Sequence, residues 1–453
     1  MCEKRRILLV SYHFAPQNKI GAVRMTKLAK YLSRLGHEVT VLCSAGMAEL
    51  QDPTLVRDLE ELRNVHVIRE WNPIRDRKER ARATPRGKEP ADPPRPGRQK
   101  RGLVQHLLWV LYRILNHISD VSFYHRGFRA LMDMNRRFDV VLSSYGPLSS
   151  HRIALKAKRR KIAEQWIADY RDVVMYPFRW QAGMARRYVR KMGEQADGVS
   201  AVSRGVLETL GFKEFGRYIP NGFDREDLGR LSSFSIPCSS LLRFAYCGQV
   251  YGGRQDLTPF FAALGKMFQE GVLQSEEVQV LYAGAEGAVI AAQARIAGME
   301  RVVCDVGRTN RAQALALQQQ SDVLLMASWN TRSQTGVLTG KLLEYMMMGK
   351  PVICCVSGDM SGSDTKRVMK ETGLGFCWEQ ACEEQDTSML EEYLRAIIRH
   401  ARQGKPIGLK RRADAIEQYA YPQIADEFSG WMLEMDKELE TKIQDDYNGS
   451  RKN

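Results

Sequence analysis

The chain has 453 residues, which allows two or three domains at about 150 residues per domain. Its hydrophobic fraction of 44% and charged fraction of 27% are ordinary for a globular protein and exclude a wholly disordered or collagen-like chain. No apolar run approaches the length of about 18 residues that a transmembrane helix needs. The apolar residues 7–10 are also too few for the core of a signal peptide, so we expect a cytoplasmic protein.

The nine cysteines form no C-x-x-C pair, so we expect reduced thiols and no metal site. The formal net charge is +15, and it is unevenly spread. Residues 75–101 contain eleven basic and four acidic residues, five prolines and almost no large apolar side chain, which predicts a flexible basic insertion. This insertion is either a solvated loop or an electrostatic contact with an anionic membrane surface. A nucleic-acid partner has no supporting motif.

Short apolar runs alternate with helical periodicity along the whole chain, which is typical of parallel α/β folds. A strand at 6–12, a helix at 24–35 and a strand at 39–42 form a first βαβ unit. Further strands are expected at 65–68, 140–142, 166–169, 198–202, 242–247, 278–283, 322–326 and 351–354. Further helices are expected at 103–117, 151–163, 259–268, 311–319, 342–348 and 389–402.

A turn-rich junction near residue 222 separates two α/β halves. We therefore predict two Rossmann-like domains, the first at 1–222 with the insertion 75–101 and the second at 223–408. Residues 409–445 are expected to form helices that pack back towards the N-terminal domain.

The segment 335–346 is the strongest candidate for chemistry. Its glycines and threonines precede a helix that follows the strand 322–326, and free amides at a helix start favour an anion. Lys341 adds a cation, and the Glu344 carboxylate is suited to accept hydrogen bonds from a ribose diol. The alternative interpretation is an ordinary loop before an exposed helix start.

Several segments resemble glycosyltransferase family 4. GKLLEYMMMGKPVI is similar to the donor-site signature of that family, and PQNKIGAVRMTKLAKYLSRLGHEVTVL to its first βαβ unit. SSYGPLSSH, IADYRD, ADGVSAVS, IPNGFD and YCGQVYGGRQD resemble further pieces in the same order. The resemblance implies the GT-B fold, in which two Rossmann-like domains face a central cleft.

The resemblance also implies retaining transfer of a sugar from a nucleotide-sugar, with no metal and no cofactor. Glu344 would hold the ribose, and Arg254 and Lys341 would neutralise the leaving diphosphate, since guanidinium and ammonium groups stabilise developing negative charge. The backbone positions expected to face the donor are Gly336, Thr339, Gly340, Gly248 and Gly21.

The sequence departs from the family at one position. The usual signature is a pair of glutamates spaced E-x7-E, and with Glu344 as the second the first falls on Gly336. We interpret this as variation within the family in preference to loss of activity.

On the acceptor side, His151 begins a basic helix and Asp172 ends a strand. His151 is a candidate contact to the donor sugar or the acceptor, and Asp172 a candidate to orient an acceptor hydroxyl. The alternatives are a structural histidine and an ion pair between Asp172 and Arg171 that fixes the loop.

The leading hypothesis is a metal-independent hexosyltransferase that acts on a lipid-linked or saccharide acceptor in surface polysaccharide or glycolipid synthesis. It would lie peripherally on the inner face of the cytoplasmic membrane. One alternative is a nucleotide-sugar epimerase of GT-B architecture, and another is a catalytically silent relative that binds a partner.

Overall fold

The computed structural model describes residues 4–17, 20–46, 51–73, 103–171, 182–230, 241–251, 254–405, 407 and 410–450. The chain forms two compact units. Unit 1 consists of Met1–Val202, Val206–Pro220 and Tyr421–Asn453, and unit 2 of Ser203–Gly205 and Asn221–Ala420. The predicted basic insertion 75–101 lies outside the described residues.

Unit 1 is built on a parallel sheet of seven strands in the order β3-β2-β1-β4-β5-β6-β7. The strands are β1 (Arg6–Ser11), β2 (Glu38–Ser44), β3 (Asn64–Ile68), β4 (Phe138–Ser144), β5 (Ala163–Tyr170), β6 (Gly198–Ala201) and β7 (Arg217–Tyr218). Alternate side chains of each strand point to opposite faces, so each face needs its own helical cover.

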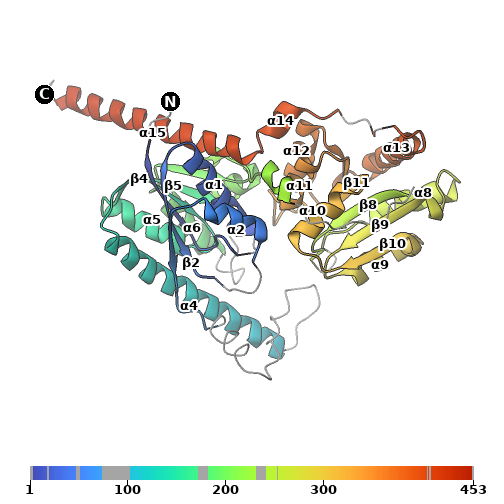
Figure 1. Cartoon of the computed structure of the whole chain (residues 1–453), viewed down its shortest axis with the longest axis horizontal. Coiled ribbons are helices and arrows are strands. Elements are labelled where there is room, and N and C mark those ends of the chain that lie inside the picture. Colours follow the sequence, from blue (N-terminus) through green and yellow to red (C-terminus); the bar gives the residue numbers. More distant parts are fainter. Residues whose placement is uncertain are drawn as a thin grey trace. The chain divides into compact units, whose positions relative to one another are not determined.

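Two hydrophobic clusters provide that cover. On one face lie α1 (Ile20–Arg34), α2 (Pro53–Glu60) and α15 (Tyr421–Ser450), which together bury alternate residues of β1, β2 and β4. On the other face lie α4 (Leu103–Asp133), α5 (Ser149–Arg159), α6 (Ala182–Gly193) and α7 (Arg204–Leu210). The end of the chain therefore returns to unit 1, where α15 lies beside α1 (Figure 1).

A buried arginine joins these elements. The Arg24 side chain on α1 is 1% exposed and makes two hydrogen bonds of 2.8 and 2.9 Å to the fully buried Asp169 on β5. It also donates to the carbonyl oxygens of Ile219 and Pro220. Arg24 thus has a structural role, because its charge is compensated and its donors join α1 to β5 and to the two residues that follow β7.

Unit 2 repeats the plan with a parallel sheet of six strands in the order β10-β9-β8-β11-β12-β13. The strands are β8 (Leu242–Cys247), β9 (Val278–Ala283), β10 (Val303–Gly307), β11 (Val323–Trp329), β12 (Val352–Ser357) and β13 (Gly375–Glu379). Short 3₁₀ helices lie at Arg225–Arg230, Ser275–Glu277, Glu300–Val302 and Gln380–Cys382.

The helices of unit 2 also cover both faces of its sheet. One cluster holds α8 (Thr258–Gln269), α9 (Gly287–Ile296) and α13 (Glu383–Arg402). The other holds α10 (Arg311–Gln319), α11 (Gly340–Met348), α12 (Asp364–Thr372) and α14 (Ala413–Glu417). The predicted α/β class with two Rossmann-like sheets is confirmed.

Candidate functional site

In each sheet the strand order reverses beside the first strand, between β1 and β4 in unit 1 and between β8 and β11 in unit 2. Ligands of open parallel sheets bind outside the carboxyl ends of the strands at this reversal. In unit 2 the segments there are residues 248–251 and 254–255, which follow β8, and residues 330–339, which follow β11 and lead into α11.

The start of α11 carries the residues predicted to face a donor. Thr339 is the N-cap in an extended conformation, but its side chain does not cap the helix and its hydroxyl instead contacts Met326 Sδ at 3.2 Å. Gly340 then begins the nine-residue helix. Helix-start amides that the N-cap side chain leaves unbonded favour an anion.

Gly336 has a structural reason to be glycine. Its φ of +75° lies in the left-handed region, and a Cβ there would be 2.8 Å from the backbone of Gly205 in the same unit. Its carbonyl oxygen accepts a 2.7 Å hydrogen bond from Ser203 Oγ. A glutamate at this position would be strained and would collide with backbone, which explains why the usual E-x7-E pair is incomplete here.

The structure brings Lys341 to the loop that follows β8. Its Nζ donates to Tyr246 Oη at 3.1 Å, to Gln249 O at 3.2 Å and to Gln255 Oε1 at 3.2 Å. Gly248 lies against it with φ +113°, and a Cβ there would be 2.9 Å from Lys341 Cε. Desolvation lowers the pKa of Lys341 to about 8, so the ammonium is still the major form at neutral pH.

Arg254 lies at the same reversal but is more exposed. Its guanidinium carbon is 4.9 Å from the centre of the Trp329 ring, at the end of β11. Tyr251 meets the same ring edge-on at 5.9 Å. An arginine stacked on an indole keeps its outer donors available while its direction is fixed.

Glu344 lies on the next turn of α11 and is held by residues of α10. Arg311 Nε donates to Glu344 Oε1 at 3.3 Å, and Gln318 Nε2 lies 3.5 Å from Oε2. Arg311 Nη1 also bonds Asp227 at 3.1 Å. Arg311 was not among the predicted residues, although its place directly after the helix-capping Asn310 marks it as the first residue of α10.

In unit 1, Gly21 lies under a guanidinium. A Cβ on Gly21 would be 1.4 Å from Arg171 Nη1, and one on Gly146 would be 2.7 Å from Nη2. Arg171 donates to Tyr145 O and Gly146 O, both at 2.7 Å. The two glycines therefore make room for Arg171, which the sequence suggested only as an ion-pair partner of Asp172.

His151 is fully buried at the start of α5. Its Nδ1 lies 2.8 Å from Ser143 Oγ, which also accepts from Trp166 Nε1, and its ring meets Tyr170 edge-on at 4.8 Å. Burial lowers the pKa of His151 to about 3, so the imidazole is neutral. Its predicted contact with a sugar stays a prediction. Asp172 lies outside the described residues.

The comparisons with known proteins agree with this arrangement. Residues 21–222 match the sequence pattern of the glycosyl transferase 4-like domain. This segment is a glycosyl transferase 4-like domain. It contains Gly21 and His151, whereas Arg254, Lys341 and Glu344 follow it in the chain. No curated protein matches the sequence.

Solved structures match almost the whole chain, including the glycosyl transferase 4-like domain and unit 2. The N-terminal domain of Candida albicans trehalose-6-phosphate phosphatase has a TM-score of 0.59 at 11% identity, covering 96% of this chain and 98% of its own. The OtsA apo structure has a TM-score of 0.59 at 9% identity, with 94% and 99% covered. The UDP-GlcNAc 2-epimerase of Neisseria meningitidis has a TM-score of 0.53 at 10% identity, with 95% and 100% covered. These likenesses establish the two-domain GT-B fold.

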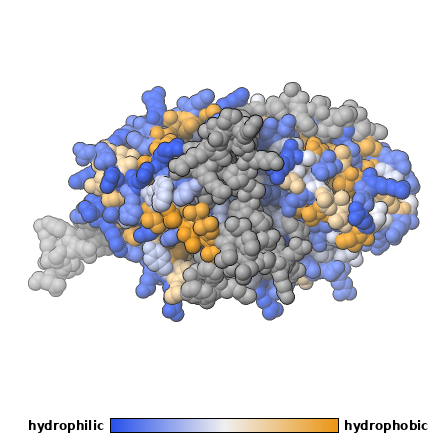
Figure 2. Space-filling model, turned by 90° about the horizontal axis from the view of Figure 1, so that it is seen from below, coloured by the Kyte–Doolittle hydropathy of each residue, from blue (hydrophilic) through white to orange (hydrophobic). Residues whose placement is uncertain are grey.

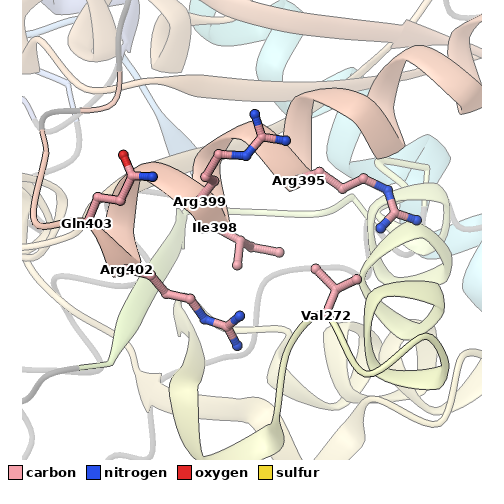
Figure 3. Close-up of a pocket in the computed structure, with 6 residues that line it drawn as sticks. All are labelled: Val272, Arg395, Ile398, Arg399, Arg402 and Gln403. Atoms are coloured by element: carbon pink, nitrogen blue, oxygen red, sulfur yellow. The ribbon is translucent and has the colours of Figure 1, made fainter.

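A separate cavity of about 370 Å³ lies along α13 in unit 2 (Figure 3). It is lined by Val272, Arg395, Ile398, Arg399, Arg402 and Gln403. Arg395 and Arg402 pair with Glu270 and Glu277, which precede the first residue of β9. The cavity therefore lies near the amino ends of the strands, away from the residues gathered at the β8–β11 reversal.

Proposed function

We propose that the protein is a retaining, metal-independent hexosyltransferase that takes its sugar from a nucleotide-sugar bound to unit 2. The observation that supports this most is α11, whose first two turns present the Lys341 ammonium and the Glu344 carboxylate at the β8–β11 reversal. The glycosyl transferase 4-like domain of residues 21–222 supports the same class of reaction.

The proposed roles follow from charge. The leaving nucleoside diphosphate gains negative charge as its bond to the sugar breaks, and Lys341 and Arg254 are cations at the end of the sheet where it would bind. The amides at Thr339 and Gly340 supply further donors to phosphate. Glu344, already oriented by Arg311, accepts hydrogen bonds from the ribose diol. Gly336 and Gly248 have no side chain, which lets the donor come close to the backbone at these positions.

We place the acceptor on unit 1. Gly21 lies at the β1–β4 reversal beside Arg171, and His151 begins the helix that follows β4. In this proposal Asp172 orients the acceptor hydroxyl, and the acceptor is lipid-linked or a saccharide destined for a surface polysaccharide or glycolipid.

A lipid-linked acceptor requires access to a membrane. No helix among the described residues is long and apolar enough to span one. Helix α4 follows the basic insertion. Two of its apolar residues, Leu111 and Ile114, are 51% and 52% exposed to solvent. Figure 2 views the molecule from below Figure 1, the side on which α4 lies, and shows patches of hydrophobic residues beside hydrophilic ones. We propose peripheral binding to the cytoplasmic face of an anionic membrane through this helix and the insertion.

Product analysis tests the class of reaction. The protein is incubated with UDP-, GDP-, ADP-, CDP- and dTDP-sugars, with and without lipid-linked acceptors, and the products are identified by mass spectrometry and by the configuration of the new linkage. We expect a product in which the sugar is joined to the acceptor with the anomeric configuration that it had in the donor, and we expect release of the nucleoside diphosphate. An isomerised nucleotide-sugar formed without acceptor would identify an epimerase. Binding without turnover of any donor would identify a silent relative.

A further inference from the structure

The loop that follows β8 is held by a carboxylate from the loop that follows β9. Glu286 Oε2 accepts hydrogen bonds from the amides of Val250 at 2.8 Å and Tyr251 at 3.2 Å. The amide of Glu286 donates to Tyr282 Oη at 3.0 Å, and this hydroxyl donates to Gly248 O at 3.0 Å. Two consecutive amides directed at one oxygen form an anion-binding arrangement, and the protein's own Glu286 fills it.

This contact fixes an unusual backbone. Tyr251 has φ +53°, a conformation that non-glycine residues adopt only when their surroundings impose it. The chain then turns back, since the Gln255 amide donates to Val250 O at 3.1 Å. The amide of Arg254 donates to Tyr251 O at 3.4 Å, and this bond links the guanidinium that stands over Trp329 to the backbone at Tyr251.

Gly284 gives independent support. A Cβ at this position would lie 2.2 Å from Tyr282 Oη and 2.5 Å from Gly248 O. Only glycine therefore lets the end of β9 approach the β8 loop closely enough for the Tyr282 and Glu286 hydrogen bonds to form.

We propose that Glu286 is a positioning residue, which holds the β8 loop so that Arg254 faces the leaving diphosphate. This inference rests on the proposed function for the role of Arg254. In this proposal Glu286 does not contact the substrate. It acts on the loop through Oε2, which accepts hydrogen bonds from the amides of Val250 and Tyr251.

The test is a double-mutant cycle on the full chain, with inorganic pyrophosphate as the probe and calorimetry at pH 7 as the measurement. We expect Glu286→Ala to weaken pyrophosphate binding about tenfold, the equivalent of one charge-assisted hydrogen bond. Glu286→Gln should restore binding, because its amide oxygen can still accept from both backbone N–H groups. In an Arg254→Ala background, Glu286→Ala should add nothing. Glu300→Ala, which removes an exposed pair with Arg295, is the matched control.

Equal losses from Glu286→Ala in both backgrounds would overturn the proposal, as would a loss that Glu286→Gln does not restore. Hydrogen–deuterium exchange separates this outcome from failure of the proposed function. Exchange across residues 248–251 should rise in Glu286→Ala and not in Glu286→Gln. If the parent protein binds no pyrophosphate while exchange responds in this way, the loop contact is correct and the diphosphate site is wrong. Unchanged exchange in Glu286→Ala refutes the positioning role itself.

Discussion

The guanidinium of Arg171 occupies the space in which a side chain on Gly21 would begin. The distance from an ideal Cβ on Gly21 to Arg171 Nη1 is only 1.4 Å, and the same guanidinium donates to the carbonyl oxygens of Tyr145 and Gly146. The Arg171 side chain, which follows β5, therefore bonds the segment after β4 and packs against the start of α1. These elements meet at the strand-order reversal of unit 1.

We predict that Gly21→Ala destabilises the protein through Arg171. The methyl group would displace the guanidinium and cost about 1–3 kcal/mol in lost hydrogen bonds, partly offset by about 1 kcal/mol from the helix preference of alanine over glycine. In an Arg171→Ala background the same change should raise the free energy of unfolding, because only the helix term remains. Urea denaturation of the four proteins measures both values. Equal destabilisation in both backgrounds would show that Arg171 is not the cause.

We predict that binding of a nucleoside diphosphate weakens between pH 7 and pH 9. Desolvation lowers the pKa of Lys341 to about 8, so the ammonium loses its proton across this range. The folded-state pKa lies below the ordinary value of 10.5, so folding releases a proton from Lys341 between about pH 8 and pH 10.5. The free energy of unfolding therefore rises with pH across that window. Calorimetric titrations at several pH values measure the affinity. Lys341→Met should bind more weakly at pH 7 and show no such decline, and a decline of the same size in this variant would assign it to another group.

We predict that sugar transfer survives chelation. Arg254 and Lys341 supply the positive charge that a divalent metal would otherwise provide to the leaving diphosphate. Initial rates are compared before and after dialysis against EDTA. Loss of turnover that manganese or magnesium restores would contradict the role given to these two side chains.

We predict that the protein sediments with anionic vesicles at 0.1 M salt and much less at 1 M, since the Debye length falls from about 10 Å to about 3 Å. Deleting residues 75–101 should remove the salt-sensitive part. Leu111→Asp with Ile114→Asp should weaken the remainder, whereas Ile296→Asp, at an apolar residue of unit 2 that is 75% exposed, should not. Absence of sedimentation at low salt would exclude the membrane role.

Periodicity in the sequence predicted the layers of the fold well. The helix predicted at 24–35 rests on the spacing of apolar residues 25, 28, 29, 32 and 35. The first four of these are fully buried in α1, whereas Leu35 follows the end of the helix and is partly buried. The helix expected at 103–117 is longer, because α4 continues to Asp133. Helix α2 was not predicted, although Asp52 caps it and Pro53 begins it, both of which are recognisable start signals.

The candidate site was only partly predictable. Glycines and charges before a helix marked Lys341 and Glu344, because a helix start is a local feature. The contacts of Arg311 with Glu344 and of Arg171 with Gly21 join residues far apart in the chain, and no local pattern encodes them. The glycine at 336 was seen as a departure from a signature, but its cause, a left-handed backbone packed against Gly205, is visible only in three dimensions.

Calorimetry with a panel of nucleoside diphosphates addresses donor binding at α11 most directly. UDP, GDP, ADP, CDP and dTDP are titrated into the unmodified protein, Glu344→Ala and the control Glu300→Ala. We expect one nucleotide to bind the unmodified protein and the control equally. We expect Glu344→Ala to lose about 1.5–3 kcal/mol, or one to two orders of magnitude in affinity, because it removes a hydrogen bond to a charged group. Equal affinity of Glu344→Ala and the unmodified protein would contradict a nucleotide-sugar site on α11.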